Sequence, residues 1–297
     1  MDSGNLALQY AFSGITIGCM YAVVAIGFSL IYSATGVLNF AQGEFVILGG
    51  MVAVTLKRFA PLPVAVVGAV AVVALVGCLL EVLFFRKLRR HSVLHMIIIT
   101  IGLSIVMQEG MLHIWDEKVC SLPYFTGNSS SSLKFLGASI QLQVFWVLGT
   151  VAVAVILLHG FLKYTLQGRA MRACSSNPEA AMLAGINIAR MRTLSFGLSA
   201  ALGALAGCVI SPITMTQYEM GGPLAIKGFA AAILGGMGNP MAAVAGGLIV
   251  GVLEAFSVSV LPAAYKDVTS FAVLLLLLFV RPHGLFGRAG GESVREH

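Results

Sequence analysis

A few polar side chains interrupt the long apolar stretches of this sequence. Glu44 lies in one such stretch, with Asn39 and Gln42 about one helical turn away, while Lys227 and Glu254 lie in two others. A charged side chain in hydrocarbon costs about 2.5–3.5 kcal/mol on insertion scales, so it needs a partner or a function. These five residues are therefore candidates either for the polar lining of a translocation pathway or for structural pairs. A Glu–Lys pair that ties the two broken helices together is one such possibility, and the sequence leaves both alternatives open.

The sequence contains none of the common hydrolytic or phosphate-binding motifs. It has no G-x-x-x-x-G-K-[ST] loop for ATP and no HExxH, CxxC or GxSxG pattern. Its five cysteines are scattered and suggest neither a disulfide nor a metal site. We therefore expect no enzyme activity, no metal and no cofactor in this chain, so that energy for any work comes from a partner or an ion gradient.

The composition indicates a polytopic membrane protein. Of the 297 residues, 58% are hydrophobic and 10% are charged, against about 45–50% and about 25% in soluble proteins. The 34 glycines fit tightly packed membrane helices. Three GxxxG patterns, which begin at Gly14, Gly203 and Gly247, predict close helix packing and nothing more specific.

Basic residues gather at the ends of apolar segments and predict the orientation of the chain. Four lie in residues 86–90, five in residues 163–192 and three after residue 280, all on one predicted face. The positive-inside rule makes that face cytoplasmic. The first ten residues, MDSGNLALQY, have no basic cluster, which argues against a cleaved signal peptide and permits an external N-terminus. We expect the N-terminus outside and the C-terminus in the cytoplasm.

The apolar segments predict an all-α membrane bundle of about eight or nine segments in a single transmembrane domain, residues 1–297. Residues 116–141 are polar and predict an external loop, and residues 163–192 a cytoplasmic one. A segment as short as 224–237 does not cross about 30 Å of hydrocarbon as a plain helix, so we expect a broken helix there. The predicted segments are residues 8–32, 33–51 (broken), 63–85, 93–115, 142–162, 193–213, 224–237, 241–261 and 270–280.

The two broken segments resemble each other. With an offset of 186 residues, residues 32–51 lie over residues 218–237 with eight identities in twenty. The first copy is predicted to start inside and the second outside, which is the arrangement of an inverted repeat with a transport site between its broken helices. Coincidence between two segments rich in Gly and Leu is the alternative.

The polar loop 163–192 contains a short helix with clear end signals. Asn177 suits the N-cap, Pro178 the first helical position and Glu179 the positive end of the helix dipole, while Gly185 ends the helix. A helix of about two turns is not stable alone in water, so it needs a surface on which to dock. Ala180 would let another chain approach closely, as would its neighbour Ala181 and also Ala184. An ordinary amphipathic loop is the alternative.

Seven segments together resemble the LivH-type permease subunit of branched-chain amino acid ABC importers. They are residues 14–21 (GITIGCMY), 26–49, 177–185 (NPEAAMLAG), 229–240 (FAAAILGGMGNP), 246–254 (GGLIVGVLE), 264–267 (AYKD) and 281–287 (RPHGLFG).

The resemblance implies an inner-membrane complex with a second, LivM-like permease, two ATP-binding subunits that use the ATP, and a periplasmic substrate-binding protein. It implies that the ATP-binding subunits dock on residues 177–185, with Asn177, Pro178, Glu179, Ala180, Ala181 and Gly185 as coupling residues. The family also includes importers of urea, short amides and aromatic acids, so the solute stays open.

We therefore expect the permease subunit of an ATP-driven importer of branched-chain amino acids or a similar small polar solute. The rival is an ion-coupled secondary transporter or channel that acts without an ATPase and uses Glu44 and Glu254 as proton or cation sites. A membrane scaffold without transport activity is a third reading, but it gives Asn39, Gln42 and Glu44 no purpose.

Overall fold

The computed structural model describes residues 3–86, 93–128, 131–135 and 138–260, with residues 262, 268, 271–272, 275–276, 279 and 284–286. The predicted last span, most of the basic cluster 86–90 and the segments 264–267 and 281–287 lie wholly or largely outside these residues.

The described chain is a helical bundle, as the sequence predicts. Six of its helices are long and apolar enough to cross a membrane, which confirms the polytopic class, whereas the exact number of segments stays a prediction. The elements are α1 (Ser3–Thr35), α2 (Gln42–Lys57), α3 (Leu62–Leu80), the π-helix η1 (Glu81–Phe85), α4 (Val93–Trp115), β1 (Ser132–Phe135), β2 (Ala138–Gln141), α5 (Leu142–Tyr164), α6 (Leu166–Ser176), α7 (Pro178–Leu183), α8 (Ile188–Thr214), the 3-10 helix η2 (Tyr218–Met220), α9 (Gly221–Gly235) and α10 (Pro240–Val260).

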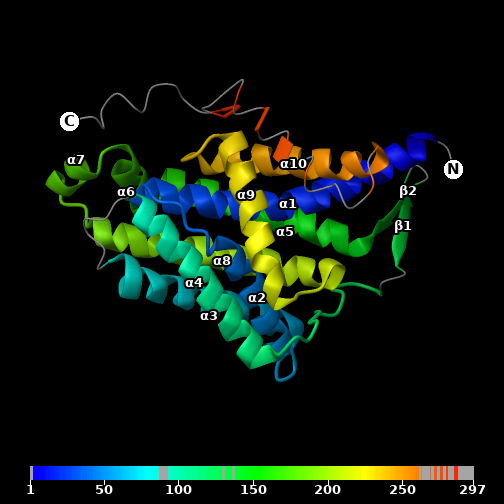
Figure 1. The fold of residues 1–297 in the computed structure, drawn as a ribbon. Helices are drawn as coiled ribbons and strands as arrows, with labels where there is room; N and C mark the ends of the chain where they lie inside the picture. Colours follow the sequence, from blue (N-terminus) through cyan, green and yellow to red (C-terminus); the bar gives the residue numbers. More distant parts are fainter. Residues whose placement is uncertain are drawn as a thin grey trace.

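Figure 1 shows how these elements are arranged. The long α1 runs along the bundle, with its beginning near the hairpin of β1 and β2 at one end. Helices α6 and α7 lie at the opposite end, and α9 crosses α1 at a steep angle. The bundle therefore has two distinct ends, one with the hairpin and one with the segment that the sequence singles out for docking.

Glycines set the closest helix contacts. α1 makes its most extensive contacts with α10, because Gly14 and Gly18 face Gly247 and Gly251 across the interface. A Cβ on Gly247 would collide with the backbone of Ala22, and one on Gly251 with the backbone of Gly18. Two of the three GxxxG patterns thus pack on each other, as small residues allow.

The third GxxxG pattern lies on α8 and packs against α2. A Cβ on Gly207 would collide with the carbonyl of Val46, and one on Gly203 would press on Phe45. The close packing that the patterns predict is therefore present at all three of them.

Both segments expected to be broken contain short helices. The chain turns at Gly36, which has φ of 71°, before α2 begins. α2 has 16 residues and α9 has 15, or about 24 Å and about 22 Å at 1.5 Å per residue. The matched glycines differ in local structure, however: Gly49 lies inside α2, whereas Gly235 ends α9 and Gly236 has φ of 117°. The inverted repeat stays a prediction.

Two regions contain more structure than the sequence analysis expected. The polar loop 116–141, which is expected to be external, holds the hairpin of β1 and β2, in which Leu133 pairs with Ile140. The polar loop 163–192 holds the 11-residue helix α6 before α7. All five cysteines are free thiols in the structure.

Candidate functional site

A pocket of about 520 Å³ lies between α1, α2, α8 and α9. This volume is in the range of small-molecule sites, about 300–1,000 Å³. Its wall is mostly apolar and carries a few polar groups, one of them cationic and one anionic. The lining residues are Met20, Tyr21, Val46, Ile47, Gly207, Ile210, Thr214, Met215, Thr216, Gln217, Glu219, Met220, Pro223, Leu224 and Lys227.

The cation of the pocket, Lys227, belongs to a buried group of three side chains. Its Nζ lies 2.8 Å from Oε1 of Glu254, and the hydroxyl of Tyr21 donates to Oε2 of Glu254 at 2.7 Å. Lys227 Nζ also lies 5.6 Å from the centre of the Tyr21 ring. Lys227 is 9% exposed, and Glu254 and Tyr21 are each 3% exposed. Because both carboxylate oxygens are engaged, Glu254 is held in place and compensates the buried ammonium group.

This group ties three helices together. Lys227 lies on α9, Glu254 on α10 and Tyr21 on α1. A Glu–Lys pair was one of the two expectations, but it joins a short helix to a long one and not the two short helices to each other. The same Lys227 lines the pocket, so this residue belongs both to a structural pair and to the pocket wall.

Glu44 is fully buried at the first turn of α2. Ser104 Oγ donates to its Oε1 at 2.8 Å, and its Oε2 has no hydrogen-bond partner among the described residues. The carboxylate lies against Gly221, the first residue of α9, where an added Cβ would collide with it. Glu44 therefore lies at the beginning of two helices, where the helix dipoles favour negative charge.

Asn39 and Gln42 make local and interhelical contacts. Ser199 Oγ donates to Gln42 Oε1 at 2.6 Å, and Gln42 Nε2 donates to the Ser199 carbonyl at 3.3 Å, which joins α2 to α8. Asn39 Oδ1 accepts from the amide of Ala41 at 3.2 Å. Neither residue is more than 1% exposed.

The five predicted pathway residues thus separate into two groups. Lys227 lines the pocket and Glu254 lies directly behind it. Asn39, Gln42 and Glu44 are not among the lining residues. Whether any of the five contacts a solute stays a prediction.

Sequence analysis missed the turn between α8 and α9, which supplies several polar lining residues. The main chain of Thr216 exchanges two hydrogen bonds with Cys120, at 2.7 and 2.9 Å, so the segment that follows α4 holds this turn in place. Met215 has φ of 59°, and Gln217 and Glu219 follow it into the pocket wall. The available signal was the polar interruption TMTQYEM just before the second short segment.

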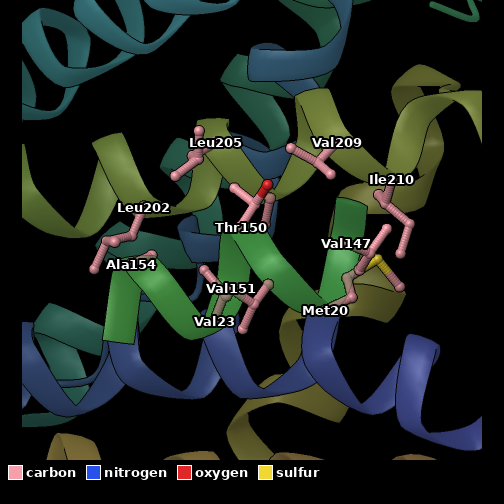
Figure 2. A pocket seen from close by; sticks show the side chains of 11 residues that line it. Met20, Val23, Val147, Thr150, Val151, Ala154, Leu202, Leu205, Val209 and Ile210 are labelled. Carbon is pink, nitrogen blue, oxygen red and sulfur yellow. The ribbon is translucent and has the colours of Figure 1, made fainter. Parts of the chain in front are cut away.

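A second hollow, shown in Figure 2, lies between α1, α5 and α8. It holds only about 10 Å³, close to the space of one water molecule. Its wall is apolar except for Thr150, whose hydroxyl is the oxygen visible in the centre of the view. Its size and chemistry do not suit a polar solute.

The short helix expected in the polar loop is present as α7, with the predicted ends. Asn177 is its N-cap, and Asn177 Oδ1 accepts from the amide of Ala180 at 3.0 Å. Gly185 has φ of 80°, a conformation that favours glycine. Its amide donates to the Met182 carbonyl and the Ile186 amide to the Ala181 carbonyl, both at 3.0 Å. This pair of bonds is a Schellman motif, so α7 is closed at both ends.

One side of α7 packs on the bundle and the other is open. Ala181 is 4% exposed and lies in an apolar cluster with Met171 and Met191, from α6 and α8. Met182 and Leu183 are 59% and 88% exposed. Ala181 therefore faces its own chain, and Met182 and Leu183 are the large apolar side chains on the open side, where Ala180 and Ala184 are exposed too. The coupling role of the segment stays a prediction.

The beginning of α8 is fixed by a buried carboxylate. Glu81, in η1, is fully buried; it accepts from Thr193 Oγ1 at 2.6 Å and lies 3.5 Å from Arg192 Nε. Its side chain is fully buried and does not reach toward the surface. This contact joins the end of α3 to the first turns of α8.

Comparisons with known proteins agree with this architecture. The profile of the family described as "Branched-chain amino acid transport system / permease component" matches residues 10–278. The high-affinity branched-chain amino acid permease LivH of Salmonella typhimurium is 34% identical over 303 residues, which cover 97% of each chain. BraD of Pseudomonas aeruginosa is 34% identical, over 97% of this chain and 98% of BraD. A probable LivH of Methanocaldococcus jannaschii is 30% identical, over 90% of this chain and 89% of that protein. The chain therefore belongs to the family of permease components of branched-chain amino acid transport systems.

Proposed function

We propose that this chain is the membrane-embedded permease subunit of an ATP-driven importer for branched-chain amino acids or a similar small polar solute. Family membership supports the class. The pocket between α1, α2, α8 and α9 supplies a site of suitable size and mixed chemistry.

The single observation that carries the coupling part of the proposal is α7. A six-residue helix that is capped at both ends and exposes Met182 and Leu183 is a rigid, apolar projection on an otherwise polar segment. Such a projection fits a groove on another protein. In this proposal, one ATP-binding subunit docks on α7 of this chain, and a second one docks on a LivM-like permease that pairs with it. A periplasmic binding protein docks at the other end of the bundle.

The proposed orientation follows the distribution of charge and the two ends of the bundle. Arg169, Arg172 and Arg190 lie in α6 and at the start of α8, next to α7. Figure 1 shows this end opposite the beginning of α1. The positive-inside rule favours a cytoplasmic α7 and an external N-terminus in the bacterial inner membrane.

A mechanical route leads from α7 to the pocket. Ala181 packs α7 against α6 and α8, and Glu81 fixes the first turns of α8 to the end of α3. α8 has 27 residues, about 40 Å of helix, and its far end contributes Ile210 and Thr214 to the pocket. A displacement of α7 by the ATP-binding subunits would therefore move one wall of the pocket.

Two substitutions, one in the first turn of α7 and one just after its end, test this proposal. Glu179→Lys places a cation at the positive end of the helix, and Gly185→Val forces a β-branched residue to φ of 80°, at about 1–2 kcal/mol. We expect both to abolish ATP-dependent uptake by the assembled complex in vesicles while the protein still inserts. Gly160→Ala, at an α5 glycine with open space around its Cβ position, is the control and should transport normally.

Normal uptake in both α7 variants would contradict the docking role. Uptake by the purified chain alone, driven by an ion gradient without ATP, would overturn the importer and favour the secondary transporter.

A further inference from the structure

Helix α3 ends in a wide turn, the π-helix η1. The amide of Arg86 donates to the carbonyl of Glu81 at 2.8 Å, a spacing of five residues where an α-helix has four. Such π-helical turns are rare, and they occur frequently at functional sites. Glu81 begins this turn and is fully buried, although a carboxylate is costly to bury. Packing alone does not account for an acidic residue at this position.

The carboxylate of Glu81 is directed at the beginning of α8. Thr193 Oγ1 donates to its Oε2 at 2.6 Å. Arg192 Nε lies 3.5 Å from its Oε1, and neither of these two atoms has a hydrogen bond among the described residues. A hydrogen bond to an ionised carboxylate is roughly twice as strong as one between neutral groups. Thr193 is therefore the main anchor of Glu81, and Arg192 is a weaker one.

Apolar contacts hold the same two helices together on both sides of Glu81. One turn before it, a Cβ on Gly197 would lie 2.7 Å from Sγ of Cys78. One turn after it, the ring centres of Phe85 and Phe196 are 4.8 Å apart. We call residues 78–85 and 192–197 the α3–α8 seam. Glu81 supplies the polar contact in the middle of this seam.

The seam continues to the beginning of α2. Phe85 and Phe196 belong to a buried apolar cluster that also contains Ala41, the N-cap residue of α2. From there α2 contributes Val46 and Ile47 to the wall of the large pocket, whereas α8 lines the pocket with its far end. Close-packed side chains transmit a displacement instead of absorbing it. A movement of the seam therefore reaches the α2 wall of the pocket as well as the α8 wall.

We propose that Glu81 is a positioning residue of the transport cycle. Its bond to Thr193 makes the end of α3 and the beginning of α8 one rigid unit, so that a displacement of α7 moves the α2 wall of the pocket together with the α8 wall. The inference rests on the proposed function and deepens it, because it names the residue that joins the two walls. Without this bond α8 moves alone, and ATP is hydrolysed without import of solute.

Thr193→Val removes the hydroxyl but keeps a side chain of similar shape. The complete complex, with its binding protein, is reconstituted in proteoliposomes, and ATP hydrolysis and the uptake of labelled leucine are measured in the same preparation. We expect the number of ATP molecules hydrolysed per leucine imported to rise at least about fivefold, the weak end of ordinary coupling between sites. A loss of folded protein lowers hydrolysis and uptake alike, so a merely structural role would leave this ratio unchanged.

Two further variants are controls for this measurement. Thr193→Ser keeps the hydroxyl and should keep the ratio of the unmodified protein. Thr16→Val makes the same change at another buried threonine, whose hydroxyl donates to the carbonyl of Phe12 on its own helix. It should leave the ratio unchanged. A normal ratio in Thr193→Val would overturn the inference.

A disulfide across the seam tests its rigidity independently. Gly197→Cys places a second thiol beside Cys78, where a small shift of a side-chain sulfur allows a disulfide. In this variant oxidation should leave leucine uptake unchanged, because the two helices already move together. In Thr193→Val/Gly197→Cys oxidation should restore the ratio of ATP to leucine, and dithiothreitol should reverse the restoration. Adding Cys78→Ser prevents the disulfide and is the matched control.

Two results of the disulfide experiment would contradict the inference. Uptake by Gly197→Cys that stops on oxidation and returns on reduction would show that the seam must open during transport. A disulfide that forms in Thr193→Val/Gly197→Cys without restoring the ratio would show that the two helices need no rigid connection. The unmodified complex separates this failure from that of the proposed function: ATP-driven uptake by it leaves the proposed function standing, whereas its lack of any ATP-driven uptake removes that function.

Discussion

The two short helices, α2 and α9, each hold a charged residue inside the bundle, but in different ways. Glu44 on α2 has a single hydrogen bond, from the neutral Ser104, and no counter-charge is seen beside it among the described residues. Lys227 on α9 has a carboxylate at 2.8 Å and lines a pocket. The charge on α2 thus lies at the junction of two helix ends, whereas the charge on α9 belongs to an ion pair beside the pocket.

Two glycines in the middle of these helices meet different kinds of atoms. In α2, a Cβ on Gly49 would collide with the backbone of Ala204, which cannot relax. In α9, a Cβ on Gly228 would meet the side chain of Val24. The contrast belongs to these two positions, because a Cβ on Gly235, at the end of α9, would also collide with main-chain atoms of Ala242.

The largest expected effect comes from breaking the α9 pair. Glu254→Ala leaves Lys227 buried without its carboxylate, so we expect the free energy of unfolding to fall by about 3–5 kcal/mol. Unfolding in mixed detergent micelles, followed by circular dichroism, measures it. Adding Lys227→Met to this variant should recover a large part of the loss, because no buried charge is then left unpaired. A double variant no more stable than Glu254→Ala would show that the pair is not the cause.

Glycine-to-alanine variants should lower the free energy of unfolding by an intermediate amount. They also distinguish the contact of Gly49 on α2 from that of Gly228 on α9. Gly49→Ala drives a methyl group into the backbone of Ala204, and we expect a loss of about 1–3 kcal/mol in the same assay. Gly228→Ala should also destabilise the protein, but Val24→Ala should relieve that loss by removing the atoms it meets.

The control for both is Gly149→Ala, at an α5 position with open space, which should be neutral or stabilising by up to about 1 kcal/mol. Full tolerance of Gly49→Ala would remove the distinction between the two helices.

The smallest effect is expected at Glu44. Glu44→Gln keeps an oxygen to accept from Ser104, and no ion pair with Glu44 is seen among the described residues. We expect a change in unfolding free energy of less than about 1 kcal/mol. A loss as large as that of Glu254→Ala would reveal a cation beside Glu44. The buried charges of α2 and α9 would then both depend on an ion pair.

Much of the local structure follows from the sequence. The predicted span 93–115 coincides with α4, and the predicted span 142–162 ends two residues before α5 does. Asn177 and Gly185 mark the ends of α7 because the capping amide and the positive φ depend on residues within one turn. Helix α6 was missed because it is amphipathic and polar on average, so a search for apolar segments passes over it.

The candidate site was only partly accessible to the same reasoning. Lys227 and Glu254 stood out because charge is rare in apolar segments, and the polar turn between α8 and α9 was overlooked because polar residues between spans are common. Gln42 stood out equally, yet it contacts Ser199 and is not part of the pocket lining. Burial of a polar residue can be predicted from its neighbours in the sequence, whereas the surface toward which it points cannot.

By itself the sequence determined the membrane class, the long spans, the short capped helix and the glycine patterns. These depend on composition and on spacings of a few residues, which act locally. Only the tertiary structure decided that Tyr21 and Glu254 meet although 233 positions separate them, that Lys227 takes Glu254 and not Glu44, and that four helices leave a pocket beside it. Such contacts depend on which helix faces pack together, and many pairings of apolar faces are compatible with the same local pattern.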